Sequence, residues 1–307
     1  MTAAATAGGR GRWWLIPPLL ALSWGLNWPA VKIMLAALPP FTLRWWGLGA
    51  AGIALLLVAL VRRRPIRPRR GETLALLASG LFNVAGFNVF TTFAQLNTST
   101  SRAAVLTYTM PLMMALMAWP LLGERLTART RLAVLIGGAG IALLAWPALG
   151  ALDAQGTAAS HERALLGLSM PLLAALSWAL GTVVSKRWPL RGDKVVNLGW
   201  QMVLGALVAM AGALLMGERV ALPLPPIVLG AFGFHVAIAM VAGYSLWFML
   251  LERLSASVSA LTTLAVPVVG VLGAMAIVGE QPAALDWLGF AAVLGAAAVV
   301  MLPSQRR

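Results

Sequence analysis

The stretch Ala21-Leu22-Ser23-Trp24 is repeated without change as Ala175-Leu176-Ser177-Trp178, 154 residues further along the chain. Each copy lies in an apolar run long enough to form a helix. Recurrence at a fixed distance is the sequence sign of an internal repeat. If the chain contains two copies of one unit, other features must recur at about the same distance.

A proline followed by a Gly-Glu pair meets this condition. Pro111 precedes Gly123-Glu124 by twelve residues, and Pro267 precedes Gly279-Glu280 by the same number, at an offset of 156 residues. Order and spacing therefore agree at several places. The sequence predicts two repeated units.

The composition places both units in a membrane. Of the 307 residues, 60% are apolar, 10% are charged and 13 are Trp, whereas soluble domains average about 45–50% apolar and about 25% charged residues. A helix needs about 20 apolar residues to cross a bilayer, so the chain has room for roughly ten helical spans. These spans are predicted at residues 14–37, 41–61, 72–95, 101–122, 130–148, 165–187, 195–216, 228–251, 257–278 and 284–302.

The distribution of positive charge predicts the orientation of the spans. With ten spans, nearly all Lys and Arg residues fall on the side of the N-terminus, and the exceptions are Lys32, Arg44, Arg102, Arg163 and Arg219. Positive charge is retained on the cytoplasmic side, so we expect a multi-pass protein of the bacterial inner membrane with both termini in the cytoplasm.

The count of spans in each half predicts how the halves are related. Residues 1–150 and residues 151–307 each contain five predicted spans. Because five is an odd number, the second half enters the membrane in the opposite orientation, as in the inverted repeats of many secondary transporters.

These features resemble the EamA-type branch of the drug/metabolite transporter superfamily. Each five-helix unit has the Pro and Gly-Glu pattern before a last span rich in small residues, Gly137-Gly138-Ala139-Gly140 and Gly295-Ala296-Ala297-Ala298. The resemblance covers essentially the whole chain. Within the branch, the Trp-rich and nearly acid-free spans are most similar to the YddG-type exporters of aromatic and other neutral amino acids. The resemblance implies an all-α fold of ten helices around a central cavity, and export by alternating access.

The first span carries a row of side chains suited to an aromatic amino acid. Trp24, Trp28 and Lys32 are four residues apart and share one helical face, with Asn27 beside them. Indole rings stack on aromatic ligands, and an ammonium group attracts a carboxylate. The alternative is that the Trp residues lie at the membrane interface and that Lys32 extends to the surface.

The third span carries a polar stripe formed by Asn88, Thr91, Thr92 and Gln95. Lipid penalises such a stripe, so it faces a water-filled cavity or is bonded to other helices. The other predicted substrate-binding residues are aromatic or titratable groups within spans. They are Tyr108, Trp178, His235 and Tyr244.

Two further features are predicted to shape the helices. Pro111 and Pro267 lie at the middle of the fourth and ninth spans, where the missing amide favours a kink that serves either as a hinge or only as structure. For the Gly-Glu pairs, we expect Gly to end one helix and Glu to favour the start of the following one, in preference to substrate binding.

Other functions are excluded or weakened by what the chain contains. It has no Cys, only two His and no nucleophile placed beside a base, so we expect no enzyme, catalytic residue, metal site or cofactor. The net charge of +14 reflects topology rather than nucleic-acid binding.

The expected partners are therefore a small-molecule substrate and lipid, while the oligomeric state stays open. All nine acidic residues lie at span ends or in loops, which predicts transport without obligatory proton coupling. The alternative functions are efflux of drug-like aromatic cations and import of another small metabolite.

Overall fold

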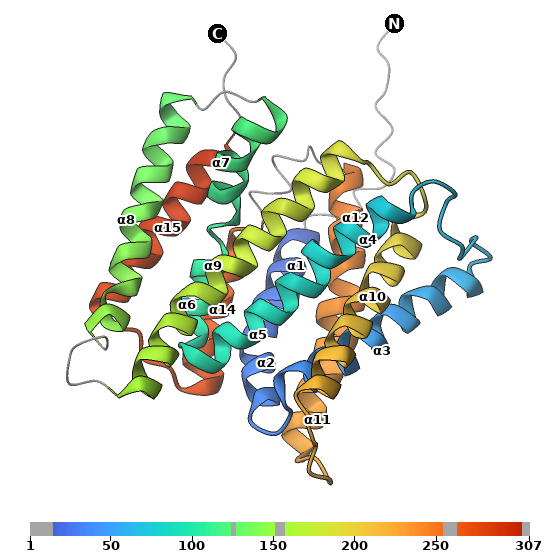
Figure 1. Cartoon of the computed structure of the whole chain (residues 1–307), viewed down its shortest axis with the longest axis horizontal. Helices are drawn as coiled ribbons and strands as arrows, with labels where there is room; N and C mark the ends of the chain where they lie inside the picture. Colours follow the sequence, from blue (N-terminus) through green and yellow to red (C-terminus); the bar gives the residue numbers. More distant parts are fainter. Residues whose placement is uncertain (1–14, 124–126, 151–156, 254–262, 303–307) are drawn as a thin grey trace, which may run out of the picture.

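The computed structural model describes residues 15–123, 127–150, 157–253 and 263–302. All regular elements in these residues are helices, and eight helices are long and apolar enough to cross a membrane. They pack side by side into one bundle (Figure 1).

The elements follow one another in the same order in the two halves; η denotes a π-helical segment. The first half contains α1 (Ile16–Gly25), α2 (Asn27–Leu35), α3 (Pro40–Val61), α4 (Thr73–Ser79), η2 (Gly80–Gly86), α5 (Phe87–Asn97), α6 (Thr100–Thr107), α7 (Met110–Leu122) and α8 (Ala128–Gly150). The second half contains α9 (Ala158–Arg187), α10 (Lys194–Leu215), α11 (Pro226–Gly233), η3 (Phe234–Ala242), α12 (Gly243–Arg253), α14 (Ala265–Gly273), η4 (Ala274–Val278) and α15 (Ala284–Met301).

Eight of the ten predicted spans correspond to the long apolar helices. The first predicted span consists of two short helices, α1 and α2, which are separated at Leu26, three residues before Pro29. For the ninth, the structure describes an apolar helix at Ala265–Val278, while residues 254–262 lie outside the described part.

The two halves pack against each other along their whole length. Helix α3 packs against α10 at one edge of the bundle, and α8 packs against α15 at the opposite edge (Figure 1). Between them, α9 contacts α5 and α7, while α1 contacts α12 and α14. Each helix therefore has its main partners in the other half.

Small residues allow the close approach at both edges. An added Cβ at Gly52 of α3 would lie 3.0 Å from the carbonyl oxygen of Gly199 in α10. At the other edge, an added Cβ at Gly140 of α8 would lie 2.9 Å from side-chain atoms of Ala292 and Val293 in α15. In lipid, helices associate through this kind of close van der Waals packing, which explains the small residues of the fifth and tenth spans.

The two π-helical segments η2 and η3 explain the repeated Ala-Leu-Ser-Trp stretch. They begin at Gly80 and Phe234, which are 154 residues apart, like the repeated stretch itself. The wider turn of a π-helix disturbs the ladder of i to i−4 hydrogen bonds and occurs frequently at functional sites. Side chains from the other half reach carbonyls there. Ser177 Oγ donates to the carbonyl of Phe82 at 2.7 Å, and Trp24 Nε1 donates to the carbonyl of Ala239 at 3.1 Å.

The glycines of α8 provide a test of the packing at the edge. Gly140→Ala should lower the midpoint of thermal unfolding in detergent, because overpacking against α15 costs about 1–3 kcal/mol. Gly138→Ala is the matched control, since nothing lies within 4 Å of its Cβ position. It should leave the midpoint unchanged or raise it. Equal effects of the two substitutions would contradict the packing described here.

Candidate functional site

A cavity of about 680 Å³ lies between the two halves. Its wall includes residues of α1, α2, α3 and α5 from the first half and of α9, η3 and α12 from the second. It extends to the ends of three helices, at Thr130, Lys186 and Met301. We call this side of the bundle the Lys186 end and the other side the Glu280 end.

Aromatic rings form much of the wall. Trp24 contacts Tyr244 and Trp247, with ring centroids 5.3 and 5.9 Å apart, and Phe87 contacts Trp178 at 4.9 Å. The chain has only two tyrosines, and both of them line this cavity. Such rings offer stacking and edge contacts to an aromatic ligand.

A buried arginine lies in the same wall. The Arg44 residue in α3 is only 2% exposed. It donates from Nη1 to Asn88 Oδ1 at 3.1 Å, from Nη2 to Thr91 Oγ1 at 3.3 Å, and from Nε to Thr92 Oγ1. The polar stripe predicted on the third span thus hydrogen-bonds to another helix, and two of its members, Asn88 and Thr91, also line the cavity.

Lys32 and His235 lie behind the cavity wall rather than in it. Lys32 Nζ donates to the carbonyl of Gln95 at 2.6 Å, so it ties α2 to α5. The Nδ1 atom of the buried His235 lies 2.7 Å from Oδ1 of Asn27, which does line the cavity. An added Cβ at Gly47 of α3 would lie 2.8 Å from the His235 ring, so the ring fills the space that this glycine leaves.

The structure brings together most of the residues predicted for substrate binding. Those that line the cavity are Trp24, Asn27, Trp28, Asn88, Thr91, Gln95, Tyr108, Trp178 and Tyr244. Sequence reasoning missed several others, among them Arg44, Phe87, Met240 and Trp247. Arg44 carries a signal in the sequence, since it follows only four residues after Pro40 in an apolar span and complements the polar stripe of the third span.

The two prolines differ from the expected kink within a continuous helix. The fourth span breaks at Tyr108 and Thr109, so that Pro111 is the second residue of α7. Pro267 is the third residue of α14, which starts after a turn at Thr263 and Leu264. Proline is tolerated in the first turn of a helix, where its missing amide would have no helical partner. Of the two, only Pro111 lines the cavity.

Four glycines in the described residues have positive φ angles, and each precedes a glutamate. They are Gly71, Gly123, Gly217 and Gly279, with φ between 62° and 83°. Glycine adopts this conformation without the strain that a Cβ causes. The sequence analysis identified two of these Gly-Glu pairs and missed Gly71-Glu72 and Gly217-Glu218, which lie 146 residues apart rather than 154–156.

The glutamates bind helix starts in the other half. Glu280 accepts from the amides of Thr100 and Ser101 at 2.6 and 2.9 Å and from Ser101 Oγ at 2.7 Å. The expectation that Glu280 favours the start of the following helix is therefore wrong for these contacts: its carboxylate caps α6. The free amides at a helix start favour any carboxylate that can reach them.

Two more glutamates make contacts of the same kind. Glu218 accepts from the amides of Phe41 and Thr42, at 3.1 and 2.7 Å, at the start of α3. Glu72 accepts from the amides of Arg191 and Gly192, at 3.1 and 3.4 Å, shortly before α10. Glu124 lies outside the described residues.

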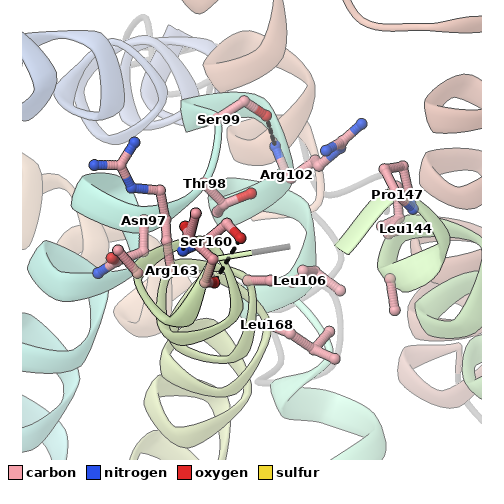
Figure 2. A pocket seen from close by; sticks show the side chains of 15 residues that line it. Asn97, Thr98, Ser99, Arg102, Leu106, Leu144, Pro147, Ser160, Arg163 and Leu168 are labelled. Carbon is pink, nitrogen blue, oxygen red and sulfur yellow. Dashed lines mark hydrogen bonds between the residues drawn. The ribbon is translucent and has the colours of Figure 1, made fainter. Parts of the chain in front are cut away.

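A second cavity, of about 520 Å³, lies between α6, α8 and the start of α9 (Figure 2). Arg102 and Arg163 line it, and Figure 2 shows their guanidinium groups on opposite sides rather than converging. Arg102 is held by Asp286, with Nε 2.7 Å from Oδ1. Because its two cations do not point at a common position, this cavity is a weaker candidate site than the central one.

The model of the EamA-like transporter family matches residues 12–146 and 165–302. The chain belongs to the EamA-like transporter family. It is thus a multi-pass membrane protein of a family of transporters, and the family model matches once in each half of the chain.

Relatives in bacteria match over most of their length. The chain is 25% identical to "Uncharacterized transporter YvbV" of Bacillus subtilis, over 89% of this chain and 86% of the relative. It is 25% identical to "Uncharacterized inner membrane transporter YedA" of Escherichia coli, over 92% and 88%. It is 24% identical to "Probable amino-acid metabolite efflux pump" of Escherichia coli, over 88% of each.

A solved structure shares the fold. A chain described as "Crystal structure of protein" superposes with a TM-score of 0.63 at 22% identity, and the match covers 95% of this chain and 96% of the other. This likeness supports the arrangement of helices that positions the cavity.

The cap of Glu280 on α6 can be tested by stability. Glu280→Gln should lower the midpoint of thermal unfolding in detergent, because hydrogen bonds to a charged group contribute about 1.5–3 kcal/mol each and an amide replaces them only in part. Glu162→Gln is the control, because Glu162 is exposed on α9. A midpoint for Glu280→Gln equal to that of the control would show that the contact contributes nothing.

Proposed function

We propose that this protein exports aromatic and other neutral amino acids, such as Trp, Phe, Met and Thr, across the bacterial inner membrane by alternating access. The observation that carries the proposal is the aromatic cavity between the halves, with Arg44 buried in its wall. Rings suit an aromatic side chain, and a guanidinium suits a carboxylate. The similarity to a relative named a probable amino-acid metabolite efflux pump supports the same substrate class.

The proposal includes ten spans arranged as two inverted five-helix repeats, residues 1–150 and 151–307. The eight long helices, together with α1–α2 and the segment ending in η4, supply ten crossings. The two matches of the family model and the 154-residue offset between η2 and η3 support the repeat. The predominance of Lys and Arg in segments on one side supports cytoplasmic termini.

Under this topology the cavity is open toward the cytoplasm. It extends to the Lys186 end, whereas the Glu280 end is closed by packed side chains and hydrogen bonds. There, Trp28 packs in a buried cluster with Ala94, Ala103 and Ala104. Alternating access requires that these contacts separate while the Lys186 end closes.

Pro111 and Pro267 are the proposed gating positions. Each lies in the first turn of a helix that begins directly after a break. A helix that starts anew can change its angle to the preceding segment without breaking continuous helical hydrogen bonds. Movement of α7 and α14 about these breaks would widen one end of the cavity and narrow the other.

Charge in the cavity disfavours the alternative of aromatic cation efflux. A cation would gain from the ring faces, but Arg44 and Lys186 line the same cavity. No acidic residue is present among the described residues that line it. An enzymatic function also lacks support, because no nucleophile lies beside a base in this wall.

Trp24 tests whether the cavity selects aromatic side chains. Trp24→Ala should lower transport of Phe and Trp in liposomes at least about fivefold more than transport of Thr, because ring contacts contribute about 0.5–1.5 kcal/mol beyond area burial. Trp24→Phe keeps a ring but loses the hydrogen bond to Ala239, and it should largely retain the preference. An equal loss for Thr and Phe in Trp24→Ala would point to a packing role.

Counterflow tests the absence of obligatory proton coupling. Liposomes loaded with unlabelled Trp should take up labelled Trp at equal pH and zero membrane potential, because the described wall holds no carboxylate that could carry a proton. His235→Gln should retain this uptake. Accumulation above equilibrium that is driven by a pH gradient and lost in His235→Gln would overturn the claim and identify His235 as the coupling residue.

A further inference from the structure

The guanidinium of Arg44 is a buried cation with only neutral partners. Asn88, Thr91 and Thr92 accept its hydrogen bonds, and no carboxylate is printed near it among the ion pairs of the described residues. Arginine stays protonated in proteins, and a buried charge without a counter-charge is costly. An anion that enters the cavity therefore gains the attraction of a cation already stripped of most of its water.

The hydrogen bonds of Arg44 leave the right donors for a carboxylate. A guanidinium has five N–H groups, and the three neutral partners use one each on Nε, Nη1 and Nη2. One N–H remains on each terminal nitrogen. Two parallel donors of this kind match the two oxygens of a carboxylate, and Arg44 lies in the cavity wall where a ligand can reach it.

The same cavity offers no equivalent partner for an ammonium group. Its described lining contains no Asp or Glu, and its charged members, Arg44 and Lys186, are both cationic. Ring faces attract an ammonium group by about 0.5–2 kcal/mol, which the repulsion from two cations opposes. The two ends of an amino acid are therefore recognised unequally.

We propose that Arg44 anchors the carboxylate of the substrate and that the α-amino group is dispensable, so that the substrate class is organic monocarboxylates with an aromatic or apolar body. This inference rests on the proposed function in taking the central cavity as the substrate site. Amino acids with apolar side chains are then one subset of the class. Deaminated aromatic acids belong to it equally, whereas aromatic amines do not.

The test uses three compounds that share one ring system. Purified protein in liposomes is assayed by counterflow of labelled Trp, with indole-3-propionate, which lacks the ammonium group, and tryptamine, which lacks the carboxylate, as competitors. Indole-3-propionate should compete within about threefold of unlabelled Trp, and tryptamine should need at least about tenfold more, a difference of about 1.4 kcal/mol. Equal competition by the acid and the amine would overturn the proposal, as would failure of the acid where Trp competes.

Substitutions at Arg44 identify the group responsible. Arg44→Gln should weaken competition by both carboxylates about tenfold or more and abolish the difference between acid and amine. Arg44→Lys keeps the charge without the fork and should be intermediate. Arg219→Gln, at an exposed position outside the cavity, is the control and should behave like the wild type. Thermal unfolding in detergent identifies a variant that does not fold, and the wild-type comparison of acid with amine stands without any variant.

Failure of the proposed function gives a different result. If labelled Trp shows no counterflow but labelled indole-3-propionate does, and Arg44→Gln removes that counterflow, export of amino acids is wrong and the carboxylate anchor stands. If Trp shows counterflow that Arg44→Gln leaves unchanged, amino-acid transport stands and the anchor is wrong. If neither compound is transported, both are wrong.

Discussion

Inside a bilayer no water is available to backbone polar groups, so every carbonyl that leaves the regular helical pattern needs a partner within the protein. The π-helical segments η2 and η3 are where this requirement joins the two halves. Ser177 and Trp24, both from the repeated sequence stretch, donate to carbonyls in these segments. Trp24 also lines the cavity, so the hydrogen bond that joins the halves at η3 also orients part of the binding surface.

The helix starts obey the same requirement at the ends of the bundle. Glu72, Glu218 and Glu280 each cross to the other half to accept from backbone amides, and each follows a glycine with a positive φ angle. Acidic residues that a sequence reader places in loops are therefore connections between halves. They also account for the acid-free cavity, because each of these carboxylates is held away from it, at a helix start.

The sequence was sufficient for the spans because hydrophobic length is a strong constraint in a membrane. The helices α3, α10 and α15 begin and end within one residue of their predicted limits. It was not sufficient for features that depend on contacts between distant segments. Nothing local to Lys32 indicates that its amine binds the carbonyl of Gln95, and nothing local to His235 indicates that it lies behind Asn27. Arg44 was assigned to a membrane face because its partners on α5 become visible only when α3 and α5 are placed together.

The neutral shell of Arg44 bears on the empty carrier. A transporter that moves net substrate has to return without cargo, and an exposed cation would make that step costly. In this protein Asn88, Thr91 and Thr92 solvate the guanidinium when no ligand is present. Helices α3 and α5 can then move together with the charge still solvated, which distinguishes a uniporter from an obligatory exchanger.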